Sequence, residues 1–197
     1  NGAGIIHDTE IAMVGRTSEE VADVLGAGAF GAARETGEVL NTAIRDGAAR
    51  GIGIGQAVGA TLLAHRFAHN DQSLLAQAAE LGVPVTVHVA MGTDIIHIHP
   101  GADGAAIGQA GHHDFRVFCR LVSDLEGGAY LNVGSAVLLP EVFLKALTLV
   151  RNLGYQVKRF TTANFDFIRH YRPATNVVHR PTLEGGKGFN FTGHHEL

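Results

Sequence analysis

The chain has 197 residues, of which 46% are hydrophobic and 17% are charged, and its formal net charge is -4. A chain of this length can bury one sizeable core, so we expect a single domain over residues 1–197. Its 15 lysines and arginines are scattered, which argues against a nucleic-acid partner. No apolar run approaches the roughly 20 residues that cross a bilayer, so no membrane partner is expected. With one cysteine, Cys119, and no secretory leader, the composition suits the cytoplasm.

The chain opens on a glycine-rich stretch, Asn1–Asp8, without an initiator methionine. Such a stretch is typical of a turn after a β-strand. We therefore expect residues 1–197 to lack the first strand of the domain and also the carboxyl-terminal end of the domain. A short helix to about Gly15 should follow. Thr17 and Glu20 have the spacing of a capping box, which predicts a further helix to about Leu25.

Residues Gly26–Gly31 match the G-x-G-x-x-G pattern of dinucleotide-binding loops. That loop needs a strand before it and a helix after it, because backbone N–H groups at the helix start must face the phosphates. The preceding residues have a helical pattern, so we interpret this motif as a turn between helices. Apolar residues at helical spacing then predict three helices, over Arg34–Arg50, Ile54–Arg66 and Asp71–Leu81.

From residue 83 onward, predicted strands and helices alternate. The strands are expected over Val83–Ala90, Ala129–Val133, Val157–Thr162 and Asn176–His179, and the helices over Asp114–Leu125 and Glu141–Leu153. The tail after Glu184 is too rich in glycine for a regular element. This alternation is typical of βαβ units and predicts an α/β fold, with a Rossmann-like parallel sheet and helices on both of its faces.

Small or polar residues follow each of the first three predicted strands, at Met91–Asp94, Gly134–Ala136 and Thr161–Asn164. In a parallel sheet, the loops after the strands lie at one edge, and ligands bind in the crevice there. We therefore expect these three turns, together with Gly2–Gly4, to line one binding site.

His97 and His99 are candidates for chemistry at this edge. They alternate, so on an extended backbone both side chains point the same way. Further acids and histidines lie close in sequence, at Asp94, Asp103, His112 and His113. Imidazole and carboxylate suit zinc, iron or manganese, but the same residues can line a polar pocket without a metal. The pattern leaves both open, and no metal ligand is assigned.

Several segments, in this order, resemble deoxyhypusine synthase. They are GAGIIHD from Gly2, GVPVTVHVAMGTD from Gly82, NVGSAV from Asn132, TTAN from Thr161 and the final Gly-x-x-Glu at Gly193. The resemblance is distant, covers nearly the whole chain and points to the bacterial deoxyhypusine synthase-like proteins. It implies NAD as cofactor, a homotetramer, and transfer of an aminoalkyl group from a polyamine by way of hydride transfer. Homospermidine synthase relatives transfer that group to putrescine.

The resemblance also assigns site residues. It implies NAD contacts at Gly2, Ala3, Gly4, Thr93, Asp94, Gly134, Ser135, Ala136, Thr162 and Ala163. Polyamine contacts would fall on His195 and Glu196. We expect His97, His99 or His195 to accept the proton, and Asp94 to contact a ribose or a substrate amine.

This chain departs from the family at its lysines. The family sequence Gly-Gly-Gly-Val-Val-Lys-His-His is replaced by Gly134–Glu141, and no counterpart of the imine-forming lysine is found. Lys145 and Lys187 are the nearby candidates. Two alternatives therefore stay open: a metal-dependent hydrolase built on His97 and His99, and a nucleotide-binding relative without catalysis.

Overall fold

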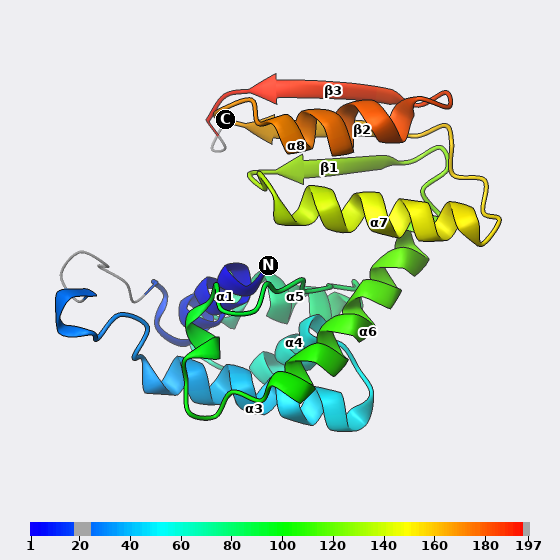
Figure 1. The fold of residues 1–197 in the computed structure, drawn as a ribbon. Coiled ribbons are helices and arrows are strands. Elements are labelled where there is room, and N and C mark those ends of the chain that lie inside the picture. Colours follow the sequence, from blue (N-terminus) through cyan, green and yellow to red (C-terminus); the bar gives the residue numbers. More distant parts are fainter. Residues whose placement is uncertain (18–24, 195–197) are drawn as a thin grey trace. The chain divides into compact units, whose positions relative to one another are not determined.

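The computed structural model describes residues 1–17 and 25–194 (Figure 1). Contacts divide the chain into two compact units, Asn1–Asp114 and Phe115–Leu197, and each is described by itself. Compact units need not fold independently, so the expectation of one domain stays a prediction. Within the described ranges, no helix is both long and apolar enough to cross a membrane.

The first unit is built from helices packed around one apolar core. They are α1 (Gly2–Val14), α3 (Arg34–Arg50), α4 (Ile54–His65), α5 (Leu74–Leu81) and the start of α6 (Gly104–Ser123), with short 3-10 turns η1 (Leu25–Ala27), η2 (Asn70–Gln72) and η3 (Ile95–His97). Fully buried side chains come from α3, α4 and η3, among them Leu40, Ile54 and Ile96. The helices predicted over residues 34–50, 54–66 and 71–81 are confirmed, with ends shifted by at most three residues.

The glycine turn predicted at the start of the chain is wrong, because α1 already begins at Gly2. Asn1 is its N-cap, and its side-chain oxygen accepts a hydrogen bond of 2.7 Å from the N–H of Gly4. Such a cap satisfies a donor at the helix start and offsets the poor helix propensity of the glycines. The helix predicted from Thr17 to Leu25 falls largely on residues 18–24, outside the described residues. Gly26–Gly31 follow in η1 and irregular chain before α3.

The strand predicted over Val83–Ala90 is also wrong. These residues run without helix, turn or bend, but they pair with no strand in the described part of the chain. A strand exists only through its pairing with a neighbour, and the alternation of apolar residues cannot supply that neighbour. Two contacts hold the segment instead. The N–H of Val87 donates to Asp114, and the carbonyl of Val85 lies against Gly55, where a Cβ atom would approach to 2.1 Å.

Asp114 of α6 is the buried acceptor that joins this segment to α4. Its Oδ2 accepts hydrogen bonds of 3.0 Å from Gly55 N–H and 2.9 Å from Val87 N–H. Burial raises the pKa of Asp114, while the hydrogen bonds from the backbone of Val87, Gly55 and Ile54 act in the opposite direction. One carboxylate thus caps the start of α4 and fixes the middle of Val83–Ala90.

Replacing Asp114 by alanine should therefore destabilise the protein by about 2–4 kcal/mol, because buried backbone donors lose their acceptor. Chemical denaturation followed by circular dichroism measures this. The matched control is Asp46→Ala, at an exposed position of α3, which should stay within about 0.5 kcal/mol of the parent chain. Equal stability of the two variants would show that Asp114 does not hold α4 in place.

The second unit is α/β and contains a small parallel sheet. Its strands are β1 (Ala129–Val133), β2 (Thr161–Asp166) and β3 (Lys187–Thr192), in the order β1-β2-β3. In register, Leu131 lies beside Ala163, and Ala163 beside Phe189. Between the strands lie α7 (Leu138–Asn152), α8 (Tyr171–Pro173), the π-helical turn η4 (Ala174–His179) and the 3-10 turn η5 (Arg180–Thr182). The predictions of β1, α7 and parallel pairing are confirmed.

Three predictions in this unit need correction. The strand expected over Val157–Thr162 begins only at Thr161, because Val157 and Phe160 are buried in the core between helices. Residues Asn176–His179 lie in the π-helical turn η4 rather than in a strand. The tail forms β3, in which Phe191 stacks on Phe165 of β2 with ring centroids 4.9 Å apart. This aromatic pair stabilises a strand in a glycine-rich segment.

The two faces of this sheet differ. On one face, Tyr130 stacks on Phe143 of α7, with ring centroids 3.8 Å apart, above a core that also includes Leu147 and Val177. The other face carries apolar side chains that are 46–59% exposed: Leu131, Val133, Phe189 and Phe191. Within this unit, therefore, helices pack on one face of the sheet.

Glu126 joins two segments at the amino edge of the sheet. Its carboxylate accepts hydrogen bonds from the N–H groups of Lys158 and Arg159, at 2.6 and 2.8 Å, and from the Arg159 side chain at 3.0 Å. These hydrogen bonds lower the pKa of Glu126 to about 2 from an ordinary value of 4.5. The ionised form therefore stabilises the folded state, and protonation removes that stabilisation.

The sign of this shift gives a pH test. The contribution of Glu126 should be fully present above pH 4.5 and should be lost as the pH falls toward about 2. Glu126→Gln removes the titration, so the difference in unfolding free energy between parent and variant should be constant above pH 4.5 and shrink below it. Urea unfolding at a series of pH values measures this. A difference that is the same at pH 7 and pH 2.5 would contradict the assignment.

Candidate functional site

The carboxyl ends of the three parallel strands lie level, and we call the loops that follow them the carboxyl edge: Gly134–Ala136, Phe167–His170 and Gly193–His194. The N–H of Gly134 donates to the Phe165 carbonyl at 2.9 Å, and the N–H of Gly193 donates to the Asp166 carbonyl at 3.0 Å. Both outer loops are thus fastened to the end of the central strand. In parallel sheets, this edge is the usual place for a ligand.

The loop Gly134–Ala136 leads from β1 into α7, as the sequence predicts. Gly134 is exposed and has a positive φ of 66°, a conformation that favours glycine. The Ser135 hydroxyl accepts a hydrogen bond of 3.2 Å from the N–H of Leu139, in the first turn of the helix. The positive end of the α7 dipole therefore lies beside an accessible small-residue loop, an arrangement that favours a phosphate.

An asparagine ladder crosses the sheet below this edge. Asn132 donates to the side-chain oxygen of Asn164 at 2.7 Å, and Asn164 donates to that of Asn190 at 2.8 Å. Asn132 also donates to the Ser135 carbonyl, which can only accept, so the orientation of all three amides is fixed. Each asparagine is the fourth residue of its strand. The ladder was not predicted, because the pattern appears only once the strand boundaries are known.

An aspartate and a histidine meet where β2 ends. Asp166 is the last residue of that strand and is 3% exposed, and its Oδ2 lies 3.9 Å from Nε2 of His170. The Asp166 Oδ1 atom accepts a hydrogen bond from the N–H of Phe167 at 2.8 Å. A carboxylate behind an imidazole can orient the ring of a general base. This pair was not predicted from the sequence, where the available signal was the i, i+4 spacing of Asp and His.

Glu141, in the first turn of α7, is the centre of a charged network beside this edge. It accepts hydrogen bonds from Arg172 at 2.9 Å and from Asn176 at 2.6 Å, and it also binds Lys145. Hydrogen bonds from Lys145 and Arg172 lower the pKa of Glu141. The network ties α7 to the segment that follows β2, and it surrounds one carboxylate with two cations.

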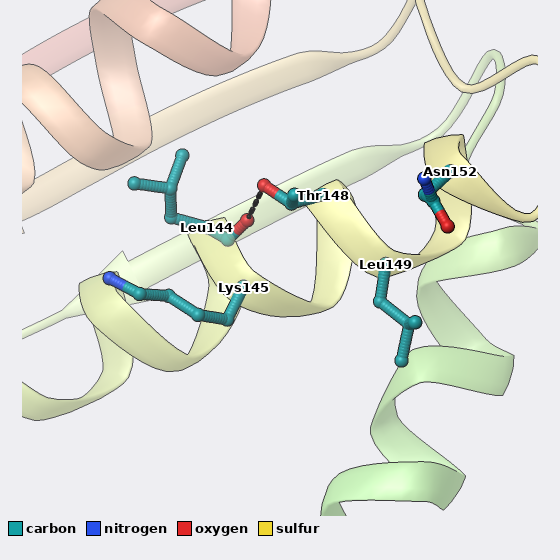
Figure 2. Close-up of a pocket in the computed structure, with 5 residues that line it drawn as sticks. All are labelled: Leu144, Lys145, Thr148, Leu149 and Asn152. Carbon is teal, nitrogen blue, oxygen red and sulfur yellow. Dashed lines mark hydrogen bonds between the residues drawn. The ribbon is translucent and has the colours of Figure 1, made fainter.

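The two lysines singled out in the sequence are placed differently. Lys145 is bound to Glu141 and lines an open pocket of about 380 Å³ along α7. Figure 2 shows it with the other lining residues, Leu144, Thr148, Leu149 and Asn152. Lys187 is the first residue of β3 and so lies at the amino end of the sheet, away from the carboxyl edge.

Thr162 and Ala163 do not form a turn, because they lie inside β2. Thr162 is fully buried on the face covered by helices, and Ala163 is 6% exposed on the other face. The predicted turn is therefore wrong, and β2 reaches its carboxyl end four residues later, at Asp166. Contact of Thr162 or Ala163 with NAD stays a prediction.

In the first unit, the structure brings Gly2 and Asp94 together. A Cβ atom on Gly2 would lie 1.9 Å from Asp94 Oδ2, so any larger residue at this position would require the Asp94 side chain to move. Asp94 also accepts a hydrogen bond of 3.1 Å from the Thr93 hydroxyl, and it caps η3. Gly2 and the start of η3 are thus in contact within the first unit, and their role in a binding site stays a prediction. A protein carboxylate occupies the position where the α1 dipole would favour an anion.

His97 and His99 stabilise turns rather than facing a common site. His97 ends the 3-10 turn η3 and His99 lies in a bend two residues later, so the extended geometry assumed from the sequence is wrong. The Nδ1 of His97 accepts hydrogen bonds from the N–H groups of Gly92 and Asp94, at 3.1 and 3.3 Å. The Nδ1 of His99 accepts one from Gly101 at 3.0 Å. No three His, Cys, Asp or Glu side chains among the described residues are grouped so that they could hold a metal ion.

His195 and Glu196, the expected polyamine contacts, lie outside the described residues. Gly2–Gly4 and Thr93–Asp94 belong to the first unit, whereas Gly134–Ala136 and Thr162–Ala163 belong to the second. Comparison of the chain with protein-family models, with curated proteins and with solved structures gives no match.

Proposed function

We propose that the protein is an NAD-dependent transferase, resembling deoxyhypusine synthase and homospermidine synthase, which acts on a polyamine or related amine. The observation that carries this proposal is the carboxyl edge, where an exposed loop of small residues leads into the start of α7. The parallel order β1-β2-β3, with α7 connecting the first two strands, is compatible with a Rossmann-like fold, although the sheet is small.

The residues at this edge fit a dinucleotide in part. Gly134 would let the phosphates approach the backbone, the N–H groups of Ser135 and Ala136 would hold them, and Lys145 and Arg172 would balance their charge. Asp94 belongs to the first unit, and its carboxylate suits a ribose hydroxyl or an amine rather than a phosphate, since like charges repel. NAD, when bound, supplies the acceptor for a hydride from the carbon next to the amine nitrogen.

We propose His170 as the residue that accepts the proton. With Nε2 directed at Asp166, its Nδ1 would take the proton from the amine nitrogen as the hydride leaves the adjacent carbon, and a C=N bond results. His97 and His99 are less suited to this role, because their Nδ1 atoms already accept backbone hydrogen bonds.

The hydride step is better supported than the transfer of the aminoalkyl group. The chain has three lysines, Lys145, Lys158 and Lys187, and only Lys145 lies in the helix that starts at the carboxyl edge. Its amine is held in an ion pair with Glu141, whereas an imine-forming lysine needs an amine that is free to attack the substrate. No observation favours the metal-dependent hydrolase. The homotetramer implied by the resemblance remains part of the proposal.

Two glycines give a matched test of the cofactor site. Gly134 and Gly127 both have positive φ, 66° and 78°. Gly134 donates its N–H to the Phe165 carbonyl at the carboxyl end of the sheet, and Gly127 donates its N–H to the Arg159 carbonyl at the amino end. Alanine at either position should cost about 1 kcal/mol in stability. Only Gly134→Ala, at the carboxyl edge, should weaken NAD binding, by tenfold or more in isothermal titration calorimetry. Equal NAD affinity of both variants, or no NAD binding by the parent chain, would refute the proposal.

Turnover tests the proposed base. His170→Ala should reduce the rate of NAD reduction with spermidine by about 10²–10⁴-fold, because the proton acceptor is lost. Its NAD affinity should remain that of the parent, and His179→Ala, at an exposed position in η4, should leave both unchanged. Asp166→Asn should also reduce the rate, because the ring of His170 loses the carboxylate that orients it. If the parent chain binds NAD but reduces none of it with any polyamine, the alternative of a nucleotide-binding relative without catalysis is favoured.

A further inference from the structure

The segment that follows β2 exposes three large apolar side chains at the carboxyl edge. Phe167, Ile168 and Tyr171 are 58%, 52% and 74% exposed, and they lie within five consecutive residues. Apolar side chains that are scattered singly over a surface are ordinary, whereas a group of them beside a candidate site favours contact with a ligand. We therefore ask which part of a ligand this segment would bind.

Tyr171 stands between two residues that are held in place. His170 lies beside Asp166, with Nε2 3.9 Å from Oδ2, and Arg172 donates a hydrogen bond of 2.9 Å to Glu141. The chain is thus fastened on both sides of Tyr171, while the tyrosine side chain is exposed. A tyrosine ring has few rotatable bonds, so a ligand that stacks on it pays little conformational entropy.

The hydrogen bond of Arg172 also determines which part of the cofactor lies near this ring. Glu141, its acceptor, is in the first turn of α7, which follows the loop Gly134–Ala136. Tyr171 therefore lies between a residue bound to the start of α7 and the proposed base, His170. In NAD, the nicotinamide ring lies between the phosphates and the substrate that gives up the hydride. With the phosphates at the loop and the amine at His170, the nicotinamide ring falls beside Tyr171.

We propose that Tyr171 stacks on the nicotinamide ring and binds its oxidised form more tightly than its reduced form. This inference rests on the proposed function and names the residue that holds the reacting part of the cofactor. The oxidised ring carries a positive charge, which the negative face of an aromatic side chain attracts. The reduced ring is neutral, so it can stack but lacks that attraction. The charge of Arg172 is offset by its ion pair with Glu141 and does not oppose the binding.

Isothermal titration calorimetry tests the proposal with NAD, with NADH and with ADP-ribose, which lacks the nicotinamide ring. Tyr171→Ala should weaken NAD binding by about tenfold, because stacking and the attraction of charge are both lost. NADH binding should weaken by a smaller factor, and ADP-ribose affinity should remain that of the parent chain. Tyr171→Phe keeps an aromatic ring and should bind NAD within about threefold of the parent.

The matched control is Tyr155→Ala, which removes a tyrosine that is 47% exposed in the connection between α7 and β2, at the amino end of the sheet. It should leave all three affinities unchanged. The proposal is overturned if Tyr171→Ala binds NAD as tightly as the parent, if it loses NADH affinity to the same extent as NAD affinity, or if it also loses ADP-ribose affinity. In each of these cases the parent chain still binds NAD, whereas a parent chain that binds no NAD refutes the proposed function itself.

Discussion

Every buried backbone group needs a hydrogen-bond partner, and the two units satisfy this requirement by different means. In the first unit, carboxylates supply the acceptors. Asp8 of α1 accepts hydrogen bonds from Leu74 N–H and Leu75 N–H and so caps α5, while Asp114 does the same for α4 and Asp94 for η3. In the second unit, the strands pair with one another. Where an acid on another segment holds the start of a helix, irregular segments can run between the helices. Paired strands, in contrast, hold their residues in a fixed register.

That register is what makes the carboxyl edge a candidate site. The asparagine ladder and the hydrogen bonds of Gly134 and Gly193 bring the ends of three strands to one level. Asp166 then stands at the end of the central strand, with a loop of small residues on one side. Because these positions are set by rigid elements, the geometry of the Asp166 and His170 pair depends on backbone pairing more than on its own side-chain contacts.

The sequence predicts those features that depend on local patterns. Helical periodicity locates α3 and α4, and the short apolar run Ala129–Val133 locates β1 within its actual bounds. Features that depend on distant partners were missed. Val157 and Phe160 look like strand residues but fill the helix-packed core, and β3 requires the stacking of Phe191 on Phe165. Since the end of β2 was misplaced, Asp166 and His170 could not be recognised as part of the site.

Gly2–Gly4 and Gly134–Ala136 look alike in the sequence, but the charges around them determine which is better suited to a phosphate. At Gly2, the start of α1 already faces the carboxylate of Asp94, so a phosphate there would meet a negative charge at close range. At Gly134, the start of α7 has its own acid, Glu141, but Lys145 and Arg172 bind that acid and offset its charge. A phosphate is therefore better accommodated after β1. The segment around Gly2 is better suited to a hydroxyl or an amine, which can donate to Asp94.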